Sequence, residues 1–243
     1  MIDVGILGYG EIGQALSEFY KDKPFNLKIK DKNSVEQLGE LVILNVCIPY
    51  NNDFLDIVYE QIQTSKPIIT IIHSTVLPGT TKRLQMLSPN KFVIHSPVRG
   101  IHPYLYDSLK RFVKYIGSDT EDGYQLAYAH LKFLGFKCER MKSSFATELS
   151  KLLCTTYYGV CIAWHDLVKK LCDRHSLEYV NVSTDWNVSY NEGYKELGMS
   201  HFTRPVLYPP EGKIGGHCVV PNAELLENLI DSSLIEEVLK FKK

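Results

Sequence analysis

The chain has 243 residues, of which 27 are Lys or Arg and 28 are Asp or Glu, so its net charge is close to zero. This length allows one large domain or two small ones, with a sizeable hydrophobic core. The charge balance argues against a general nucleic-acid binder, and no apolar run reaches the roughly 18 residues that cross a bilayer.

The six cysteines form no Cys-x-x-Cys pair and show no zinc-finger spacing. A chain of this length does not need disulfide bonds, and its first residues lack the basic and apolar stretches of a signal peptide. We therefore expect reduced thiols, no metal site, no membrane partner and a cytoplasmic location.

The first 140 residues alternate between short β-prone apolar runs and amphipathic helical segments. The expected strands are 2–7, 26–30, 41–48, 67–72, 92–95, 113–117 and 136–140. The expected helices are 14–19, 53–63, 80–87 and 121–134. This alternation predicts an α/β fold, with a Rossmann domain and a doubly wound parallel sheet over residues 1–140.

Residues 141–243 differ in character and predict a smaller, all-helical domain. The segment 143–174 has helical periodicity, no proline and apolar residues around much of its surface, which predicts one long buried helix. We expect this helix to build a homodimer interface; the alternative is a helical domain within one chain. Residues 179–210 are expected to form loops and short helices, and 223–241 a terminal amphipathic helix.

A glycine-rich turn, Gly8-Tyr9-Gly10-Glu11-Ile12-Gly13, follows the first expected strand and opens the first helix. Gly8 allows a tight turn, Gly10 lets the backbone approach a pyrophosphate, and Gly13 lets helix and strand pack closely. Glu11 is expected to face solvent. The amino end of a helix offers free N–H groups to phosphates, so this turn, with Glu11 and Ile12, predicts a dinucleotide site.

Asp31 lies 23 residues after Gly8, at the end of the second expected strand. An acid at this place binds the adenosine ribose and favours NAD over NADP. Two alternatives remain open: Lys30 and Lys32 could serve a 2′-phosphate, or Asp31 could be a solvated surface acid.

Two further segments place polar or nucleophilic groups where a ligand is expected. Pro49 ends one strand and Ser74-Thr75 follow another, so all three are expected beside the cofactor, because ligands bind outside the carboxyl ends of strands. In the segment 215–222, two glycines precede Cys218 and would expose its thiol to a close-approaching ligand. The alternative is a buried core thiol.

Four motifs occur in order: the glycine turn, the Ser74–Thr81 loop, Glu148-Leu149-Ser150-Lys151 and Gly215–Cys218. In this order they resemble the UDP-glucose/GDP-mannose dehydrogenase family of the 6-phosphogluconate dehydrogenase-like superfamily. The resemblance covers nearly the whole chain. It implies NAD-dependent oxidation of the C6 alcohol of a nucleotide sugar to an acid in two steps, and dimerisation through the long helix.

The resemblance also implies roles for individual side chains. Cys218 would be the nucleophile that forms a thiohemiacetal with the intermediate aldehyde. Lys151 would stabilise developing oxyanion charge, and Thr75 would lie near the nicotinamide and the catalytic water. The residues expected to contact the substrate are Lys151, Thr155, Gly216 and Asn222.

The chain departs from the family pattern in four respects. Thr155 stands where the family has asparagine, and Asn222 stands where it has aspartate. The segment 96–100 has no acid where the family has a glutamate, and the third domain, which holds the nucleotide, is not matched. An asparagine cannot act as a base, so activation of the thiol or of water would be impaired.

We therefore expect an NAD-dependent dehydrogenase with its active site between two domains, Lys151 and Cys218 lying on opposite walls. One alternative is an NAD-binding regulatory or scaffold protein that has lost catalysis, with Lys151 a surface lysine. Another is a dehydrogenase or reductase of a different small substrate, which uses Lys151 as acid and base and leaves Cys218 idle.

Overall fold

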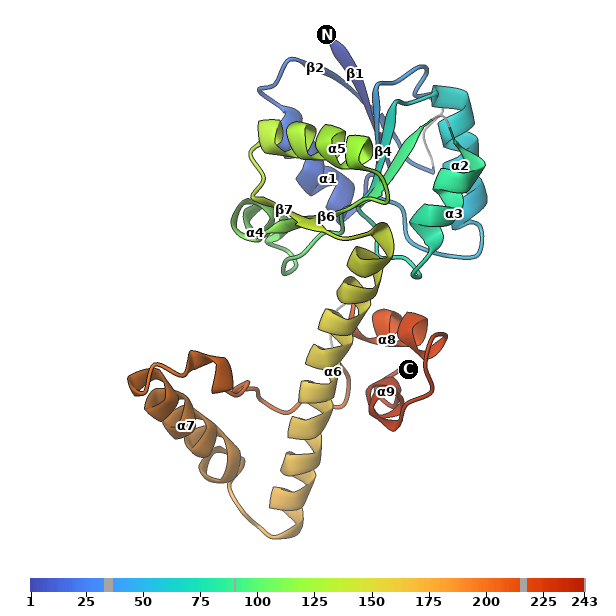
Figure 1. Cartoon of the computed structure of the whole chain (residues 1–243). Coiled ribbons are helices and arrows are strands. Elements are labelled where there is room, and N and C mark those ends of the chain that lie inside the picture. Colours follow the sequence, from blue (N-terminus) through green and yellow to red (C-terminus); the bar gives the residue numbers. More distant parts are fainter. Residues whose placement is uncertain (33–36, 90, 215–217, 243) are drawn as a thin grey trace. The chain divides into compact units, whose positions relative to one another are not determined.

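The structure is a computed structural model that describes residues 1–32, 37–89, 91–214 and 218–242 (Figure 1). The chain divides into two compact units, Met1–Lys151 and Leu152–Lys243. No helix within the described ranges is long and apolar enough to cross a membrane.

The first unit is built on a seven-stranded sheet in the order β2-β1-β3-β4-β5-β6-β7. The strands are β1 (Ile2–Leu7), β2 (Phe25–Lys30), β3 (Ile43–Val46), β4 (Ile69–Ile72), β5 (Phe92–His95), β6 (Lys114–Gly117) and β7 (Cys138–Met141). All neighbouring strands run parallel except β5 and β6. The predicted α/β fold with a Rossmann sheet is confirmed.

The antiparallel β5–β6 pair is a departure from the predicted all-parallel sheet. The chain between these strands forms a short helix, α4 (Leu105–Arg111), which the sequence analysis did not anticipate. An antiparallel strand can begin at the end of the sheet where the preceding strand stops, so the chain need not cross to the other end. β6 therefore begins at the end of the sheet where β5 stops.

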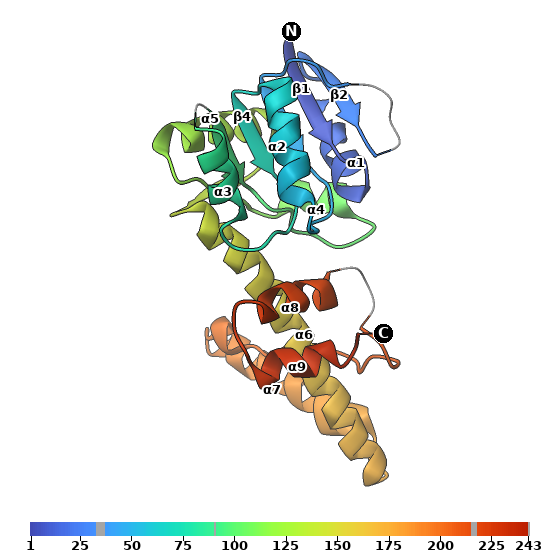
Figure 2. The ribbon, with the colours of Figure 1, turned by 90° about the vertical axis from the view of Figure 1, so that its right-hand side faces the viewer.

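Helices cover both faces of the sheet (Figures 1 and 2). One face carries α1 (Glu11–Ser17), α4 and α5 (Glu121–Leu134), and its core is closed by Phe19, Leu109, Leu131 and Phe136. The other face carries α2 (Phe54–Ser65) and α3 (Thr80–Leu87). Because both faces are buried, β3 and β4 are apolar along almost their whole length, which made them recognisable in the sequence.

The strand order places a ligand crevice at one edge of the sheet. β1 lies between β2 and β3, so the connections from β1 and from β3 run in opposite directions along the sheet. Such a topological switch point opens a crevice at the carboxyl ends of the strands. The glycine turn after β1 and the segments after β3, β4 and β5 all meet at this edge.

The second unit is helical. It contains most of α6 (Ser144–Arg174), a π-helical turn (Val180–Thr184), α7 (Asp185–Glu196), α8 (Val219–Glu227) and α9 (Ser233–Leu239). A Cβ at Gly159 of α6 would lie 2.6 Å from Val219 and 2.8 Å from Val238, so glycine allows α8 and α9 to pack closely on α6 (Figure 2).

One expectation for this unit was wrong. The terminal segment forms two helices, not one over 223–241: α8 ends at Glu227, and the extended residue Ser232 is the N-cap of α9. Pro221 lies inside α8 in its first turn, where its missing N–H costs no hydrogen bond. The segment 179–210 contains loops and helices as expected, and α7 is the longest of these helices at 12 residues.

A chain of buried polar groups runs through the core of the first unit. The Tyr20 hydroxyl lies 2.7 Å from His130 Nε2 and accepts from Asn45 Nδ2 at 3.0 Å. The side-chain amide oxygen of Asn45, Oδ1, lies 2.9 Å from His73 Nε2. Burial lowers the pKa of His130 to about 4 and that of His73 well below the ordinary value. Both side chains are therefore neutral at pH 7.

This burial predicts that acid destabilises the protein. A histidine whose pKa is depressed in the folded state contributes stability that is present above pH 6.5 and is lost as pH falls towards the folded pKa. His73 and His130 should each lower the free energy of unfolding by up to about 1.4 kcal/mol per pH unit in that window. We expect a lower urea midpoint at pH 5 than at pH 7.5. The exposed His175→Gln variant should keep this difference, and equal midpoints at both pH values would contradict the prediction.

Candidate active site

The glycine turn is formed by close backbone approaches. Gly8 has φ +94°, and a Cβ there would lie 2.9 Å from the Cys47 carbonyl carbon. A Cβ on Gly13 would lie 2.1 Å from Gly8 O, whereas one on Gly10 would meet no atom within 4 Å. Gly10 is the N-cap of α1. The turn therefore has an open face at Gly10, where the first N–H groups of the helix are directed outward.

The end of β2 approaches this turn. The backbone N–H of Tyr9 donates to Asp31 Oδ1 at 3.4 Å. The ammonium group of Lys30 instead donates to Gln61 Oε1 at 2.9 Å. Gln61 belongs to α2, which covers the face of the sheet opposite to α1. The acid thus lies at the turn, and the lysine that precedes it is directed away from it.

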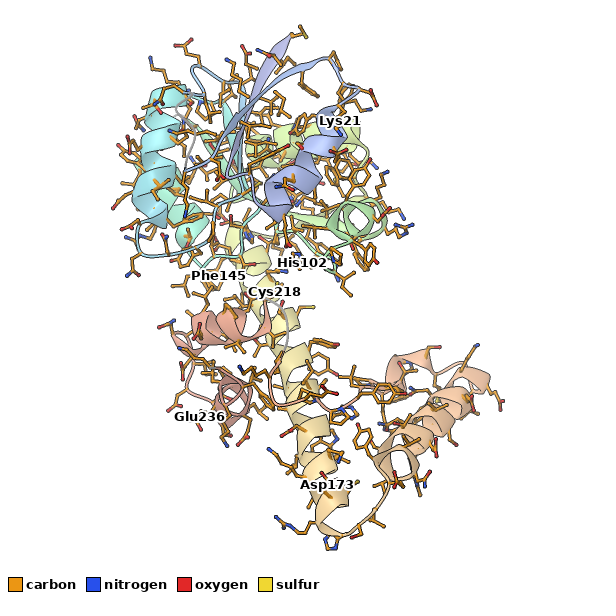
Figure 3. All side chains as sticks on the ribbon, turned by 180° about the vertical axis from the view of Figure 1, so that it is seen from behind. Lys21, His102, Phe145, Asp173, Cys218 and Glu236 are labelled. Atoms are coloured by element: carbon orange, nitrogen blue, oxygen red, sulfur yellow. The ribbon has the colours of Figure 1, made fainter. Side chains whose placement is uncertain are left out.

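Glu11, in the first turn of α1, forms an ion pair with His102. His102 lies in the segment after β5, so this pair connects that segment to the glycine turn (Figure 3). The side chain of Glu11 is 58% exposed, and it faces solvent as expected apart from this pair.

The segments after β3 and β4 are joined to each other. Ser74 Oγ donates to Ile48 O at 2.6 Å, and Pro49 follows as an exposed residue. Thr75 is half-buried beside them. The crevice edge is therefore continuous from Gly8 through Ile48 to Ser74 and Thr75.

His95, the last residue of β5, continues this edge. Its Nε2 lies 3.1 Å from Ser74 O, and its Nδ1 lies 2.8 Å from the hydroxyl of Thr147 in α6. Burial and the charges of Lys114 and Lys151 together lower its pKa to about 3. His95 is therefore a neutral bridge between the Ser74 carbonyl and α6.

Glu148, in the next position of α6, binds the other end of the Ser74–Thr81 loop. Its carboxylate accepts from Gly79 N at 2.7 Å, Thr81 N at 2.8 Å and Thr81 Oγ1 at 2.6 Å. Gly79 is the N-cap of α3 and has no side chain, so Glu148 supplies the capping oxygen from another helix. Burial raises the pKa of Glu148, and the bonds from Thr81 and Gly79 oppose that rise.

Lys151 lies three residues after Glu148 on α6 and is half-buried. Its charge lowers the pKa of both His95 and Lys114, which places its ammonium group near this edge of the sheet. Thr155, one turn later, is half-buried and belongs to the second unit.

Lys114 of β6 is a buried lysine that the sequence analysis missed. Its ammonium group donates to Ser96 O and to Pro97 O, and burial lowers its pKa to about 7. It fixes the backbone immediately after β5, a segment that has no acid at 96–100. A lysine at the first position of an otherwise apolar strand was the only sequence signal for it.

Cys218 and Asn222 lie in the second unit. Cys218 is the N-cap of α8 and half-buried (Figure 3). Asn222 follows one turn later and is only 4% exposed, and its Nδ2 has no hydrogen-bond partner among the described residues. The predicted substrate residue Gly216 lies outside the described residues.

The nine predicted cofactor residues lie at the same end of the sheet. Gly8, Gly10, Glu11, Ile12, Gly13, Asp31, Pro49, Ser74 and Thr75 all lie at or after the carboxyl ends of β1 to β4. Within the described ranges, no cluster of His, Cys, Asp or Glu is arranged to hold a metal ion.

Known proteins match this chain in sequence and in fold. The UDP-N-acetyl-D-mannosamine dehydrogenase of Pyrococcus horikoshii is 26% identical in an alignment of 219 positions, which covers 82% of this chain and 49% of that protein. A solved structure of UDP-D-ManNAc dehydrogenase from the same organism matches with a TM-score of 0.78 at 18% identity, covering 98% of this chain and 67% of that chain. The resemblance to nucleotide-sugar dehydrogenases is confirmed. No protein-family profile matches the chain.

A shorter enzyme has a similar fold. The 3-hydroxyisobutyrate dehydrogenase of Mycobacterium tuberculosis has a TM-score of 0.75 at 14% identity, covering 98% of this chain and 91% of that chain. By contrast, the chain spans about half the length of the curated relative, 49%.

Two glycines of the turn, Gly10 and Gly13, predict a contrast between variants. Gly13→Ala should destabilise the fold by about 1–3 kcal/mol or more, because its methyl group would overlap Gly8 O. Gly10→Ala should stay within about 0.5 kcal/mol of wild type, because its Cβ would meet nothing and its φ of −72° suits alanine. Urea unfolding of the two purified variants checks this, and equal losses would refute the turn geometry.

Proposed function

We propose that the protein is an NAD-dependent oxidoreductase that acts on a CH–OH group, with a nucleotide sugar as its substrate class. The main support for this proposal is the group of three hydrogen bonds that the Glu148 carboxylate accepts. These bonds connect the loop of Thr75 to the helix of Lys151, beside a glycine turn suited to a dinucleotide. The sequence similarity to a UDP-N-acetyl-D-mannosamine dehydrogenase supports the substrate class.

The contacts after β2 favour NAD over NADP. Asp31 accepts from Tyr9 N in the glycine turn, where its carboxylate can bind ribose hydroxyls and repels a 2′-phosphate. Lys30 donates to Gln61 on α2 and so is not directed to that place. Of the two lysines considered for a 2′-phosphate, Lys32 alone remains.

The residues of the chain would divide the chemistry as follows. Bound NAD supplies a nicotinamide that accepts hydride from the substrate carbon. Lys151 stabilises the alkoxide oxygen as the alcohol loses its proton and hydride to become an aldehyde. Thr75 lies beside the nicotinamide. The neutral His95 nearby keeps the positive charge of the site on Lys151.

Cys218 would carry the second oxidation. Its sulfur adds to the aldehyde carbon, the thiol proton passes to the carbonyl oxygen, and a thiohemiacetal forms. The thiohemiacetal would then lose a hydride to a second NAD and its hydroxyl proton to water, which gives a thioester. Water cleaves the thioester to the acid and the free thiol. Asn222 and Thr155 contact the substrate in this proposal. Because Asn222 cannot accept the thiol proton, the second oxidation should be the slower one.

We further propose a cytoplasmic homodimer that pairs through α6. Five large apolar side chains recur along this helix at spacings of three, four or seven residues and remain exposed in the single chain. They are Leu153, Tyr157, Trp164, Leu167 and Leu171, each between 45% and 63% exposed. An exposed apolar stripe of this kind is typical of a helix that packs on a partner. All six cysteines are free thiols, which supports a reducing compartment.

A second candidate is a dehydrogenase of a small hydroxy acid, in which Lys151 acts as acid and base and Cys218 is idle. One observation favours it: the chain covers 91% of the length of a 3-hydroxyisobutyrate dehydrogenase. Asn222 cannot act as a base for the thiol of Cys218, which fits this candidate as well.

Cofactor titration followed by turnover tests the main proposal. NADH should bind more tightly than NADPH, and Gly10→Ala should weaken binding while it keeps the fold. Reduced cofactor should appear with NAD and a UDP-sugar or GDP-sugar. Cys218→Ser should still release one hydride per substrate but not two, whereas Lys151→Ala should lose about 10²-fold or more in kcat.

The other outcomes are equally informative. Turnover of hydroxy acids alone, unaffected by Cys218→Ser, would replace the main proposal by the second candidate. Tight NADH binding without turnover of either class would indicate a regulatory or scaffold protein. If neither cofactor binds, the proposal fails.

The exposed stripe on α6 predicts a dimer in solution. The double variant Trp164→Glu/Leu171→Glu should be monomeric at micromolar concentration, because paired carboxylates cannot be buried in the interface. Lys169→Glu, on the opposite side of α6, should remain dimeric. Light scattering coupled to size-exclusion chromatography measures both masses, and a monomeric wild type would contradict the prediction.

A further inference from the structure

The first turn of α6 is attached to the sheet of the first unit at several points. Asp119, after β6, accepts from Ser144 N at 3.1 Å and from Ser144 Oγ at 2.7 Å, and so caps the helix. A Cβ at Gly117 would lie 2.3 Å from Thr147 Oγ1, so glycine there lets the helix approach β6. These contacts fix where the helix begins.

Thr147 and Glu148, also in this part of α6, are attached to the two ends of the Ser74–Thr81 loop. Thr147 holds the amino-terminal end through His95, whose ring lies between the Thr147 hydroxyl and Ser74 O. Ser74 O can only accept, so the neutral ring carries its proton on Nε2. The Thr147 hydroxyl lies 2.8 Å from both His95 Nδ1 and Ser144 O, and its single proton is shared between these two acceptors. The hydrogen bonds that join Ser74, His95 and Thr147 therefore involve no charged group.

Glu148 holds the carboxyl-terminal end. Its two carboxylate oxygens accept three hydrogen bonds from Gly79 and Thr81, and the residue is fully buried. Bonds to a buried carboxylate are strong and directional, and an uncharged replacement leaves at least one donor unpaired. The loop that contains Thr75 is thereby attached at both ends to one helical turn.

Lys151 follows on the same side of that helix, four residues after Thr147 and three after Glu148. Residues at these spacings lie on one face of an α-helix, a single turn apart. We propose that His95 and Glu148 are positioning residues that fix Thr75 and Lys151 relative to each other through the first turn of α6. This inference rests on the proposed function for the roles of Thr75 and Lys151, but the attachment itself does not.

Two substitutions remove one attachment each. Thr147→Val keeps the shape but removes the hydroxyl that bonds His95, and Glu148→Gln replaces an acceptor oxygen by a donor. Thr147→Ser restores the hydroxyl and should behave as wild type. Glu139→Gln, on the exposed part of β7, is the matched control for loss of a carboxylate.

Turnover with NAD and the substrate found for the wild type gives the first readout. Thr147→Val and Glu148→Gln should each lower kcat at least about tenfold, since small displacements of reacting groups cost rate steeply. The affinity for NADH should fall less than kcat, because these variants disturb the loop of Ser74 and Thr75 but not the glycine turn that would bind the pyrophosphate. A loss of unfolding free energy with unchanged kcat would show a merely structural role and overturn the proposal.

Acylation of Lys151 by acetic anhydride, followed by mass spectrometry, gives a readout that needs no substrate. Relative to Lys240, the acylation rate of Lys151 should change several-fold in Thr147→Val and Glu148→Gln, but not in Thr147→Ser or Glu139→Gln. Equal rates in all five proteins would overturn the proposal. If the wild type turns over no substrate, the proposed function fails, and the acylation rates still decide whether these residues position Lys151.

Discussion

The buried carboxylate of Glu148 is the constraint on which the candidate site depends. It comes from the helix that leaves the Rossmann sheet, and it caps a different helix, α3, whose own N-cap is the side-chain-free Gly79. Two segments nearly 70 residues apart are thereby locked together, and any displacement of α6 would leave a buried charge without its donors. The geometry of the loop after β4 and the start of α6 is therefore one structural unit.

The edge of the sheet is otherwise held by neutral groups. His95 joins Ser74 to Thr147, and Ser74 joins the ends of β4 and β3. Burial keeps His73, His95 and His130 uncharged at pH 7. A network of neutral donors and acceptors avoids the desolvation cost of ions, so the positive charge of Lys151 stands out in its surroundings. This arrangement suits a site in which negative charge develops on a substrate oxygen.

The second unit leaves many large apolar side chains exposed to solvent. Its long helix packs on α8 and α9 through Gly159, yet it leaves a stripe of aromatic and aliphatic side chains in solvent. Asn222, almost fully buried beside the start of α8, retains an amide nitrogen without a partner among the described residues. Both features are consistent with a unit that is completed by a substrate and by a second copy of the chain.

The sequence by itself determined the Rossmann sheet, the glycine turn and, to within two residues, the bounds of α2, α3, α5 and α6. These follow from local causes: uninterrupted apolar runs for β3 and β4, glycines where the backbone must approach closely, and 3.6-residue periodicity over α3, α5 and α6. The antiparallel β6, the division of the terminal segment into α8 and α9, and the roles of His95, Glu148 and Lys114 were decided by the tertiary structure. No local sequence pattern marks a carboxylate that caps a helix 67 residues away, or a lysine that donates to carbonyls just after a neighbouring strand. The hydrogen-bond partners of these two side chains come from distant segments, which lie next to them only in the folded sheet.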